Sequence, residues 1–398
     1  MPARFTEIKI RPGPNPLISH TFSRQAFMTT SAAPSTPSGN STPSGNSTEA
    51  VTDTTVTDSR YALVQAWLAP LAEKYGIRID SLRPASSDAS FRRYFRVDTE
   101  ADSLIIMDAP PAHEDCRPFV DIATRLDQAE LNVPKILEAQ IDQGLLLLSD
   151  LGHDTYYQRI VNGMDDATLQ AHYLSALEAL VSMQQVPSDH LPSYDSAKLR
   201  DELSLFPDWY VARHCNAELS DQERAALNTI FDNLSAHNAR QATCFVHRDF
   251  HSPNLMINDH PENGTGPGII DFQDAVCGPV SYDLVSLVMD ARTTWEEPQQ
   301  LDWAIRYWEQ AKKAGIPVPA DFADFHVDYE WMGLQRNLRI LGVFARLSIR
   351  DGKSHYQQHM PRVNAYVRQV AARYNAFRPL LRLLDRLDNI ETKVGYTF

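Results

Sequence analysis

The spacing of hydrophobic and polar residues separates a tail from a folded body. Residues 1–58 carry few large apolar side chains and are rich in Ser, Thr, Pro, Gly and Asn, and the hexamer STPSGN is repeated at 35–46. Such a segment cannot bury enough apolar surface to offset the entropy lost on ordering. We therefore expect a disordered, low-complexity tail. It is either a dispensable extension, or a stretch before the true start at Met28, or a basic, Ser-rich transit segment, and we favour the first two alternatives over the third.

The first part of the body predicts a small lobe that combines strands with helices. Apolar residues at helical spacing predict a first helix that begins after Asp58 and ends at Gly76. Shorter runs, either alternating or continuously apolar, predict strands on both sides of a second helix. The predicted strands are 90–97, 104–107, 133–137 and 145–148, and the predicted helix is 114–130. We expect residues 59–150 to form this α+β lobe.

The remainder of the body, residues 151–398, predicts a larger helical lobe. Residues 166–184 and 331–345 carry apolar side chains at helical spacing. The exception is a short strand–loop–strand pattern at 244–271. A layout of two lobes leaves a cleft between them, where ligands commonly bind.

Composition narrows the possible functions. The chain has 37 Lys and Arg against 51 Asp and Glu, which gives a net charge of −14. Because an acidic surface repels the phosphates of nucleic acids, we expect no nucleic-acid partner. No apolar run approaches the ~18 residues that a membrane-spanning helix needs, and the four cysteines form no CxxC pair. We therefore expect a cytoplasmic protein with no membrane partner.

Chemistry is concentrated where short apolar runs end in polar residues. His247, Asp249 and Asn254 form the pattern HxDxxxxN, and Asp271 follows the apolar run at 268–270. Phosphoryl transfer needs one carboxylate to accept a proton, and amide and carboxylate oxygens to hold magnesium. The alternative is that both aspartates merely form turns, but their order and flanking strands favour phosphoryl transfer. The chain contains no GxxxxGK phosphate-binding motif.

Several sequence blocks together resemble one family of small-molecule kinases. HRDFHSPNLM, GIIDFQDAVCGP and SYDLVSL resemble the catalytic core of the aminoglycoside phosphotransferase and choline kinase-like family, whose members have the two-lobed protein-kinase-like fold. Within it, SSDASFRRYFRV, LFPDWYVARH and GLQRNLRILGVFARL most resemble the bacterial anomeric kinases of N-acetylmuramate and N-acetylglucosamine in peptidoglycan recycling. The resemblance runs from about residue 60 to the end of the chain.

The resemblance implies roles for the residues of the catalytic segment. Asp249 would be the general base that orients and deprotonates the sugar hydroxyl. Asn254 and Asp271 would hold Mg²⁺ against the phosphates of ATP. Asp283 would anchor the catalytic loop from a helix, and His247 would support the loop rather than transfer protons.

The resemblance also implies a nucleotide site on the small lobe. The strand that runs into Ser149 and Leu151 would be the hinge that takes the adenine. The loop that covers the phosphates is usually rich in glycine, but residues 86–90 contain none. Ser90 would contact the phosphates in their place.

The usual phosphate-binding lysine is missing from the third strand, which reads LIIM at 104–107. Arg93 is our candidate for the replacement, with Arg92 and Arg96 as rivals. The alternative is that these arginines form ion pairs with nearby acids on the strand face.

The acceptor should bind on the helical lobe opposite Asp249. Asp208 and Asp274 are candidates for binding sugar hydroxyls. Arg336 is a candidate for the lactyl carboxylate of N-acetylmuramate, because a guanidinium matches a carboxylate with two parallel hydrogen bonds. The alternative is that these residues belong to a packed helix, a turn and the surface.

The resulting hypothesis is an ATP- and Mg²⁺-dependent kinase of an N-acetylated amino sugar. A kinase of another small alcohol, such as an aminoglycoside, choline or a homoserine-like metabolite, is the nearest rival. A non-catalytic nucleotide-binding module is the rival of another class, because the strand lysine and the glycines are missing. The sequence leaves open the preferred sugar, the choice of ATP or GTP, the oligomeric state and any protein partner.

Overall fold

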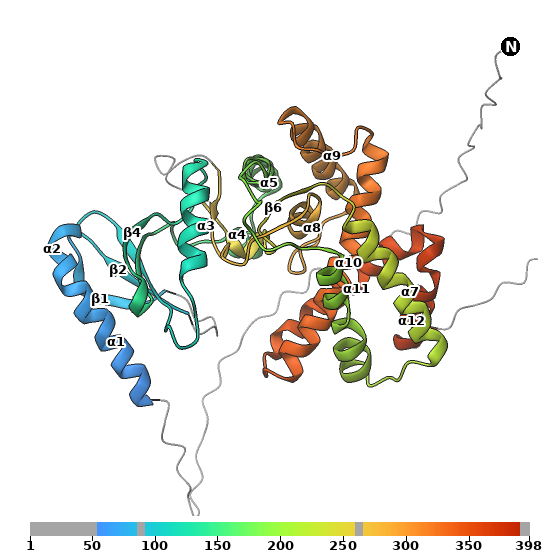
Figure 1. The fold of residues 1–398 in the computed structure, drawn as a ribbon, viewed down its shortest axis with the longest axis horizontal. Helices are drawn as coiled ribbons and strands as arrows, with labels where there is room; N and C mark the ends of the chain where they lie inside the picture. The colour runs from blue at the N-terminus through green and yellow to red at the C-terminus, as the bar shows by residue number, and fades with distance from the viewer. Residues whose placement is uncertain (1–53, 86–91, 259–265, 391–398) are drawn as a thin grey trace, which may run out of the picture. The chain divides into compact units, whose positions relative to one another are not determined.

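Among the described residues, five strands form an antiparallel sheet in the small lobe (Figure 1). They are β1 (Arg78–Pro84), β2 (Arg93–Asp98), β3 (Ser103–Asp108), β4 (Ile136–Gln140) and β5 (Leu145–Ser149), in the spatial order β1-β2-β3-β5-β4. The structure, a computed structural model, describes residues 54–85, 92–258 and 266–390. Almost all of the expected tail, and Ser90 of the expected phosphate loop, lie outside these ranges.

The first described helix, α1 (Thr54–Leu68), begins four residues before the expected boundary at 58. No Gly or Pro occurs between 49 and 58, so the local sequence contains no strong helix-stopping signal there. The helix continues through η1 (Ala69–Leu71) and α2 (Ala72–Tyr75). It ends at Gly76, whose φ of 64° is left-handed and favours glycine. That end confirms the prediction.

The two faces of the sheet belong to two different hydrophobic cores. Because side chains alternate along a strand, Leu145 and Leu147 of β5 pack in the core that contains α1. Leu146 and Leu148 face the other way and join the core that continues into the large lobe, together with α3 (Arg117–Gln128). Both faces are therefore covered, which explains the uninterrupted run of leucines.

The large lobe is mainly helical, as the sequence predicts (Figure 1). Helix α5 (Asp166–Gln184) has the predicted bounds. The other helical elements are α4 (Tyr156–Val161), α6 (Ser196–Leu203), η3 (Phe206–His214), α7 (Asp221–Asn238), η4 (Ser252–Asn254), α8 (Tyr282–Val288), α9 (Glu297–Lys313), α10 (Phe322–Ile349), η6 (Ser354–His359), α11 (Met360–Arg373), η7 (Asn375–Phe377) and α12 (Arg378–Leu387). Within the described ranges, no helix is long and apolar enough to cross a membrane.

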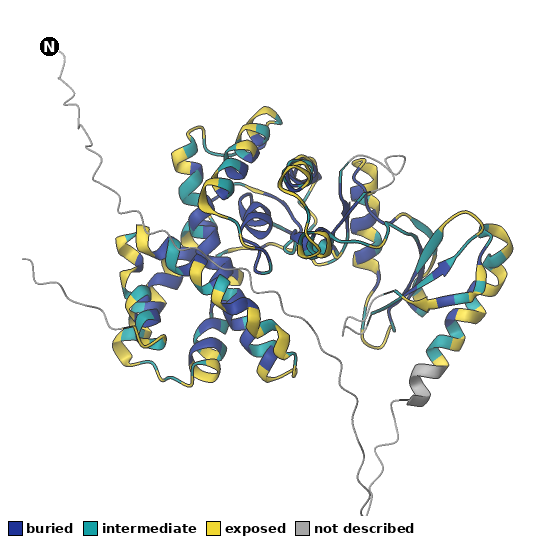
Figure 2. Cartoon of the chain, turned by 180° about the vertical axis from the view of Figure 1, so that it is seen from behind, coloured by how far each residue is buried: buried dark blue, intermediate teal, exposed yellow. Residues whose placement is uncertain are grey.

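Two helices form the interior of the large lobe. All residues of α8 are buried, and α10 is buried along most of its length (Figure 2). α10 approaches the start of η3 so closely that a Cβ atom on Gly342 would lie 2.4 Å from the carbonyl oxygen of Leu205. Glycine is therefore required at this contact, because any side chain would displace the neighbouring backbone. The rigid contact fixes α10, which carries Arg336, against the rest of the lobe.

Two short antiparallel pairs of strands hold the catalytic segment. β6 (Thr243–Val246) pairs with β9 (Val276–Pro279), and β7 (Leu255–Met256) pairs with β8 (Gly268–Ile269). Residues 247–254 connect β6 to β7, and Asp271 follows β8. The pairing therefore brings the two halves of the sequence motif to one place, although 17 residues separate Asn254 from Asp271.

Candidate active site

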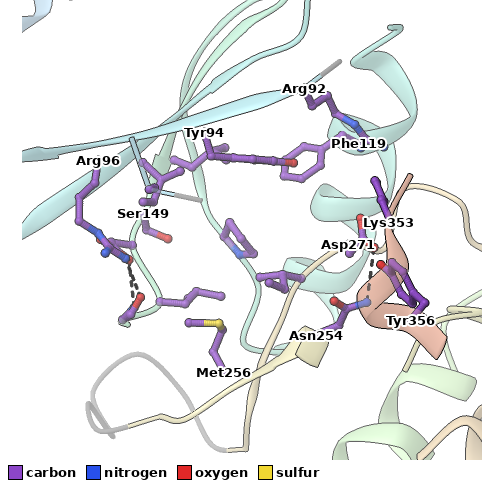
Figure 3. A pocket seen from close by; sticks show the side chains of 18 residues that line it. Arg92, Tyr94, Arg96, Phe119, Ser149, Asn254, Met256, Asp271, Lys353 and Tyr356 are labelled. Atoms are coloured by element: carbon purple, nitrogen blue, oxygen red, sulfur yellow. Dashed lines mark hydrogen bonds and ion pairs between the residues drawn. The ribbon is translucent and has the colours of Figure 1, made fainter. Parts of the chain in front are cut away.

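A cavity of about 400 Å³ lies where the sheet meets the β7–β8 pair (Figure 3). The small lobe contributes side chains from β2, β3, β5 and α3 to its wall. The large lobe contributes Asn254 and Asp271, together with Lys353 and Tyr356 from the segment after α10. Ser149 and Met256 lie at one end, and the four residues of the large lobe lie at the other (Figure 3). The end that we expect to receive the adenine and the polar end therefore belong to one cavity.

The catalytic loop is held from behind by a buried carboxylate. The backbone N–H groups of His247 and Arg248 donate to the two oxygens of Asp283, at 2.6 and 3.0 Å. Asp283 is completely buried on α8. Arg248 has a φ of 76°, which is rare for a residue with a side chain. The paired hydrogen bonds to Asp283 offset the cost of that conformation, about 1–3 kcal/mol.

The ring of His247 ties the catalytic loop to the strand that precedes Asp271. Its Nε2 lies 3.0 Å from the carbonyl oxygen of Ile270, and its Nδ1 lies 3.3 Å from the backbone nitrogen of Asp249. Because a carbonyl only accepts and an N–H only donates, Nε2 carries the proton and Nδ1 accepts. Burial lowers the pKa of His247 and keeps the ring neutral. This geometry supports a positioning role for His247.

Asp249 is the carboxylate that the loop presents to solvent. Its side chain is 42% exposed, and one oxygen lies 3.8 Å from His251 Nε2 and 3.9 Å from Arg336 Nη2. Burial alone would raise the pKa of Asp249, but the surrounding positive charges, led by those of His251 and Arg339, lower the pKa to about 2. The carboxylate is therefore ionised at neutral pH. It can orient a hydroxyl and accept its proton as the reaction proceeds.

Asn254 and Asp271 lie in contact at the polar end of the cavity (Figure 3). The side-chain amide of Asn254 donates to the backbone carbonyl of Asp249 at 3.0 Å and lies 3.4 Å from a carboxylate oxygen of Asp271. Gln273 donates to the other oxygen of Asp271 at 2.8 Å. Asp271 has a left-handed φ of 65°, which Asp tolerates better than most residues. The amide is thereby oriented and the carboxylate is fixed on the cavity wall.

The donor set of Asn254 and Asp271 fits magnesium. Mg²⁺ prefers oxygen ligands and is usually held by one or two carboxylates, with phosphates and water completing its shell. Among the described residues, no three His, Cys, Asp or Glu side chains gather into a complete metal cage. The two residues could therefore hold Mg²⁺ only together with the oxygens of a bound phosphate compound.

Ser149 and Leu151 both line the cavity, as the hinge hypothesis requires. Ser149 is fixed by the backbone of Lys135, whose N–H donates to the serine hydroxyl at 2.8 Å and whose carbonyl accepts the serine N–H at 2.9 Å. Ile105 and Leu148 add an apolar surface beside them. A flat aromatic base could be received between these apolar side chains and Met256.

Arg93 does not line the cavity, which corrects our choice among the three arginines. Side chains alternate along β2, so the cavity receives Arg92, Tyr94 and Arg96, whereas Arg93 lies on the other face. There it pairs with the fully buried Asp108, which also pairs with Arg60 of α1. The sequence contained this information, because Arg93 occupies the same set of alternate positions as the apolar residues Phe95 and Val97. That spacing predicts that the three side chains lie on one face of the strand.

The two arginines on the cavity side already have acidic partners. Arg96 Nε lies 2.5 Å from Asp150, and Arg96 Nη2 also donates to the carbonyl oxygen of Gly152 at 2.7 Å. Arg92 lies 3.6 Å from Glu114. These contacts agree with the alternative that the arginines form ion pairs, so within the described part of the small lobe both cavity-side arginines have acidic partners.

Of the three acceptor candidates, the structure brings only Arg336 to Asp249 among the described residues. Arg336 lies on α10 and is only 3% exposed. Asp208 is exposed on η3, and Asp274 is exposed after Asp271. Neither forms an ion pair or hydrogen bond with Asp249 within the described ranges. Like Arg336 and Asp249 themselves, neither lines the cavity described above. The positions of the candidates in the sequence do not show which of them faces Asp249, because the packing of α10 determines where Arg336 lies.

Other cavity residues were missed by the sequence analysis. Lys353 and Tyr356 lie about 100 residues after the catalytic loop, and no motif marks them. Phe119 of α3 also lines the cavity. His251, which the sequence analysis did not single out, is buried beside Asp249. Its position two residues after Asp249 was the one available signal.

Comparisons with known proteins agree with this geometry. Residues 81–322, more than half of the chain, match the family model described as "Phosphotransferase enzyme family". An N-acetylmuramate/N-acetylglucosamine kinase of Pseudomonas aeruginosa is 43% identical over 338 residues, which cover 83% of this chain and 97% of that protein. The protein of the same name from Neisseria meningitidis is 40% identical over 342 residues, which cover 85% and 99%.

A solved structure supports the fold independently. A choline/ethanolamine kinase family protein from Mesorhizobium loti matches with a TM-score of 0.53 at 14% identity, over 82% of this chain and 99% of its own length. At this identity the likeness concerns the fold alone. It confirms the expected two-lobed α+β fold, and the sequence matches confirm the expected resemblance. The chain belongs to the phosphotransferase enzyme family.

Proposed function

We propose that the protein is an ATP-dependent kinase that phosphorylates the anomeric hydroxyl of N-acetylmuramate and N-acetylglucosamine, in peptidoglycan recycling. The observation that carries the proposal is that Asn254 contacts both Asp249 and Asp271 at the edge of the cavity, in a chain at least 40% identical to two kinases of that name. Because ATP is the co-substrate, we also propose that the protein acts in the cytoplasm.

Asp249 would perform the proton transfer. Its ionised carboxylate would accept a hydrogen bond from the anomeric hydroxyl, orient its oxygen towards the terminal phosphate of ATP, and take the proton as the bond to phosphorus forms. An anomeric hydroxyl is more acidic than an ordinary alcohol. A carboxylate with a pKa of about 2 is a weak base, so it serves chiefly by orientation, and the easier acceptor compensates.

Asn254 and Asp271 would hold the phosphate end of the nucleotide through Mg²⁺. When bound, the ion would supply positive charge to the phosphate oxygens. The hydrogen bond between the amide of Asn254 and the carbonyl of Asp249 links the metal ligands to the base. The spacing between base and phosphate would therefore be set by the protein before the substrates arrive.

Arg336 would recognise the carboxylate of N-acetylmuramate. Its guanidinium is buried 3.9 Å from Asp249, and its Nε has no hydrogen-bond partner among the described residues. A buried donor without a partner is costly, and an anionic group of the acceptor would satisfy it. N-acetylglucosamine lacks this carboxylate and would bind through its hydroxyl and acetamido groups alone.

The test is product analysis by phosphorus NMR. The protein is incubated with ATP, Mg²⁺ and either sugar, with choline and an aminoglycoside as alternative acceptors. We expect a phosphate coupled to the proton of the anomeric carbon with both sugars. Phosphate on another hydroxyl, or turnover only with choline or the aminoglycoside, contradicts the proposal. Absence of turnover with every acceptor indicates a non-catalytic module.

A further inference from the structure

The phosphates of a bound nucleotide need nearby positive charge, and in the described part of the small lobe the cationic side chains that line the cavity already have acidic partners. From β3, the cavity receives Ile105, which is apolar. Arg96 is committed to Asp150 and the carbonyl of Gly152, and Arg92 lies within 3.6 Å of Glu114. A triphosphate at the polar end would also meet the negative charge of Asp271. Mg²⁺ compensates part of this charge, but kinases commonly add a lysine.

The segment after α10 brings one lysine to the place where that charge is needed. α10 ends at Ile349, and Gly352 has a left-handed φ of 68° that reverses the chain. The backbone N–H of Lys353 donates to the carbonyl of Leu347 at 3.0 Å and fixes the turn. Lys353 then lines the cavity at the same end as Asn254 and Asp271 (Figure 3).

Lys353 is available to a ligand. Within residues 54–85, 92–258 and 266–390, no ion pair engages its ammonium group, and the side chain is partly exposed. An ammonium on a flexible four-carbon stem can follow a phosphate group without precise alignment, and it carries three donors. Tyr356, one turn later, lines the same wall.

We propose that Lys353 is the phosphate-binding lysine of this enzyme and that it neutralises the terminal phosphate of ATP from the large lobe, in place of a lysine on β3. This inference rests on the proposed function. It assigns the phosphate rather than the sugar carboxylate to Lys353, because Lys353 shares its end of the cavity with the metal ligands. The sugar carboxylate is assigned to Arg336, which contacts Asp249 instead.

The inference predicts that the contribution of Lys353 depends on the length of the phosphate chain. Calorimetry with the full-length protein would compare ATP, ADP and adenosine, in the presence of Mg²⁺, for the wild type and Lys353→Met. We expect ATP to bind about ten- to a hundredfold more weakly to the variant, as is typical for a lost hydrogen bond to a charged group. ADP should lose less affinity, and adenosine should lose none.

Two variants serve as controls. Lys353→Arg keeps the charge and should restore most of the affinity for ATP. Lys313→Met removes an exposed lysine of α9 that does not line the cavity, and it should leave binding and thermal stability unchanged. The thermal unfolding of Lys353→Met should match that of the wild type, since the side chain packs in no core.

Three results would overturn the inference. The first is an equal loss of affinity for ATP and adenosine, and the second is no loss of affinity for ATP. The third is an increase of KM confined to N-acetylmuramate, which would move Lys353 to the acceptor site. Failure of the proposed function is separate, because it would leave the wild type inactive on both sugars while the binding series still reports on Lys353.

Discussion

The catalytic segment of the large lobe and the nucleotide face of the small lobe reach the same cavity but are stabilised differently. The catalytic segment rests on hydrogen bonds to buried groups, such as those from the loop backbone to Asp283. The nucleotide face is supported by ion pairs, such as that of Arg96 with Asp150, whose side chains are only 13% and 4% exposed. The two arrangements serve different tasks.

This difference teaches how each side of the cavity is fixed. Hydrogen bonds to a buried acceptor fix the backbone of the catalytic loop, and a phosphoryl transfer depends on such positioning. The largely buried ion pair of Arg96 with Asp150 holds the guanidinium at the wall, because separating the pair would leave a buried charge without a partner. The catalytic groups are therefore preformed, and the arginine of the nucleotide face stays with its own acid rather than moving to the phosphates. Substitutions on the two sides should differ accordingly.

The largest effect on activity is expected at Asp249, the proposed general base. Asp249→Asn keeps the shape but cannot accept the proton, so kcat should fall by roughly 10²–10⁴-fold. ATP affinity, measured by calorimetry, should change less than about twofold, because Asn254 and Asp271 are intact. A variant that retains full kcat would show that Asp249 is not the base, and would remove the main evidence that the large lobe carries the chemistry.

The next largest effect is expected at Asp283, the buried carboxylate that supports the catalytic loop. Asp283→Asn replaces one acceptor oxygen by an N–H₂ group that faces a backbone N–H, which leaves a buried donor unpaired. We expect a loss of about 1–3 kcal/mol in the free energy of unfolding, measured by urea denaturation, and a lower kcat. Asp127→Asn, at an exposed position of α3, is the matched control. If both variants behave like the wild type, the loop is not held by Asp283.

A smaller and more selective effect is expected at Arg336. Arg336→Met removes the proposed partner of the substrate carboxylate, so KM for N-acetylmuramate should rise about ten- to a hundredfold. KM for N-acetylglucosamine should rise much less. Steady-state kinetics with both sugars measures the ratio. An equal loss with both would mean that Arg336 acts through Asp249, whose carboxylate lies 3.9 Å away, rather than through the acceptor.

The smallest effect on activity separates the two faces of β2. Arg93→Met removes one partner of Asp108 but leaves Arg60 in place, so it should lower stability and leave KM for ATP unchanged. Arg96→Met changes the cavity wall itself, and KM for ATP should rise severalfold. A larger rise with Arg93→Met than with Arg96→Met would contradict the strand register that places Arg93 on the far face.

Much of the fold was readable because its signals are local. The leucine run of β5, the helix at 166–184 and the helix end at Gly76 all depend on spacing within one element. The start of α1 was placed four residues too late, because the helix needs no cap at Asp58 to continue. Helix boundaries depend on weak local preferences and are therefore harder to place than the helices themselves.

The candidate site was readable where one short motif contains it. HxDxxxxN and the aspartate after the next strand specify which oxygens serve the chemistry, because one tight loop and one strand pair leave them few possible positions. The acceptor side has no such motif. Asp208 and Asp274 were as plausible as Arg336 from their chemistry, and only the structure separates them.

The sequence by itself determined the two-lobed organisation, the family and which oxygen-bearing residues, Asp249, Asn254 and Asp271, lie together in the large lobe. The tertiary structure decided which arginine of β2 faces the cavity, which acceptor candidate meets Asp249, and that Lys353 lines the same cavity as Asn254 and Asp271. The physical reason is the sequence separation over which each kind of interaction acts. Alternation and helical periodicity act over a few residues, whereas the packing of α10 and the turn at Gly352 join residues about 100 positions apart.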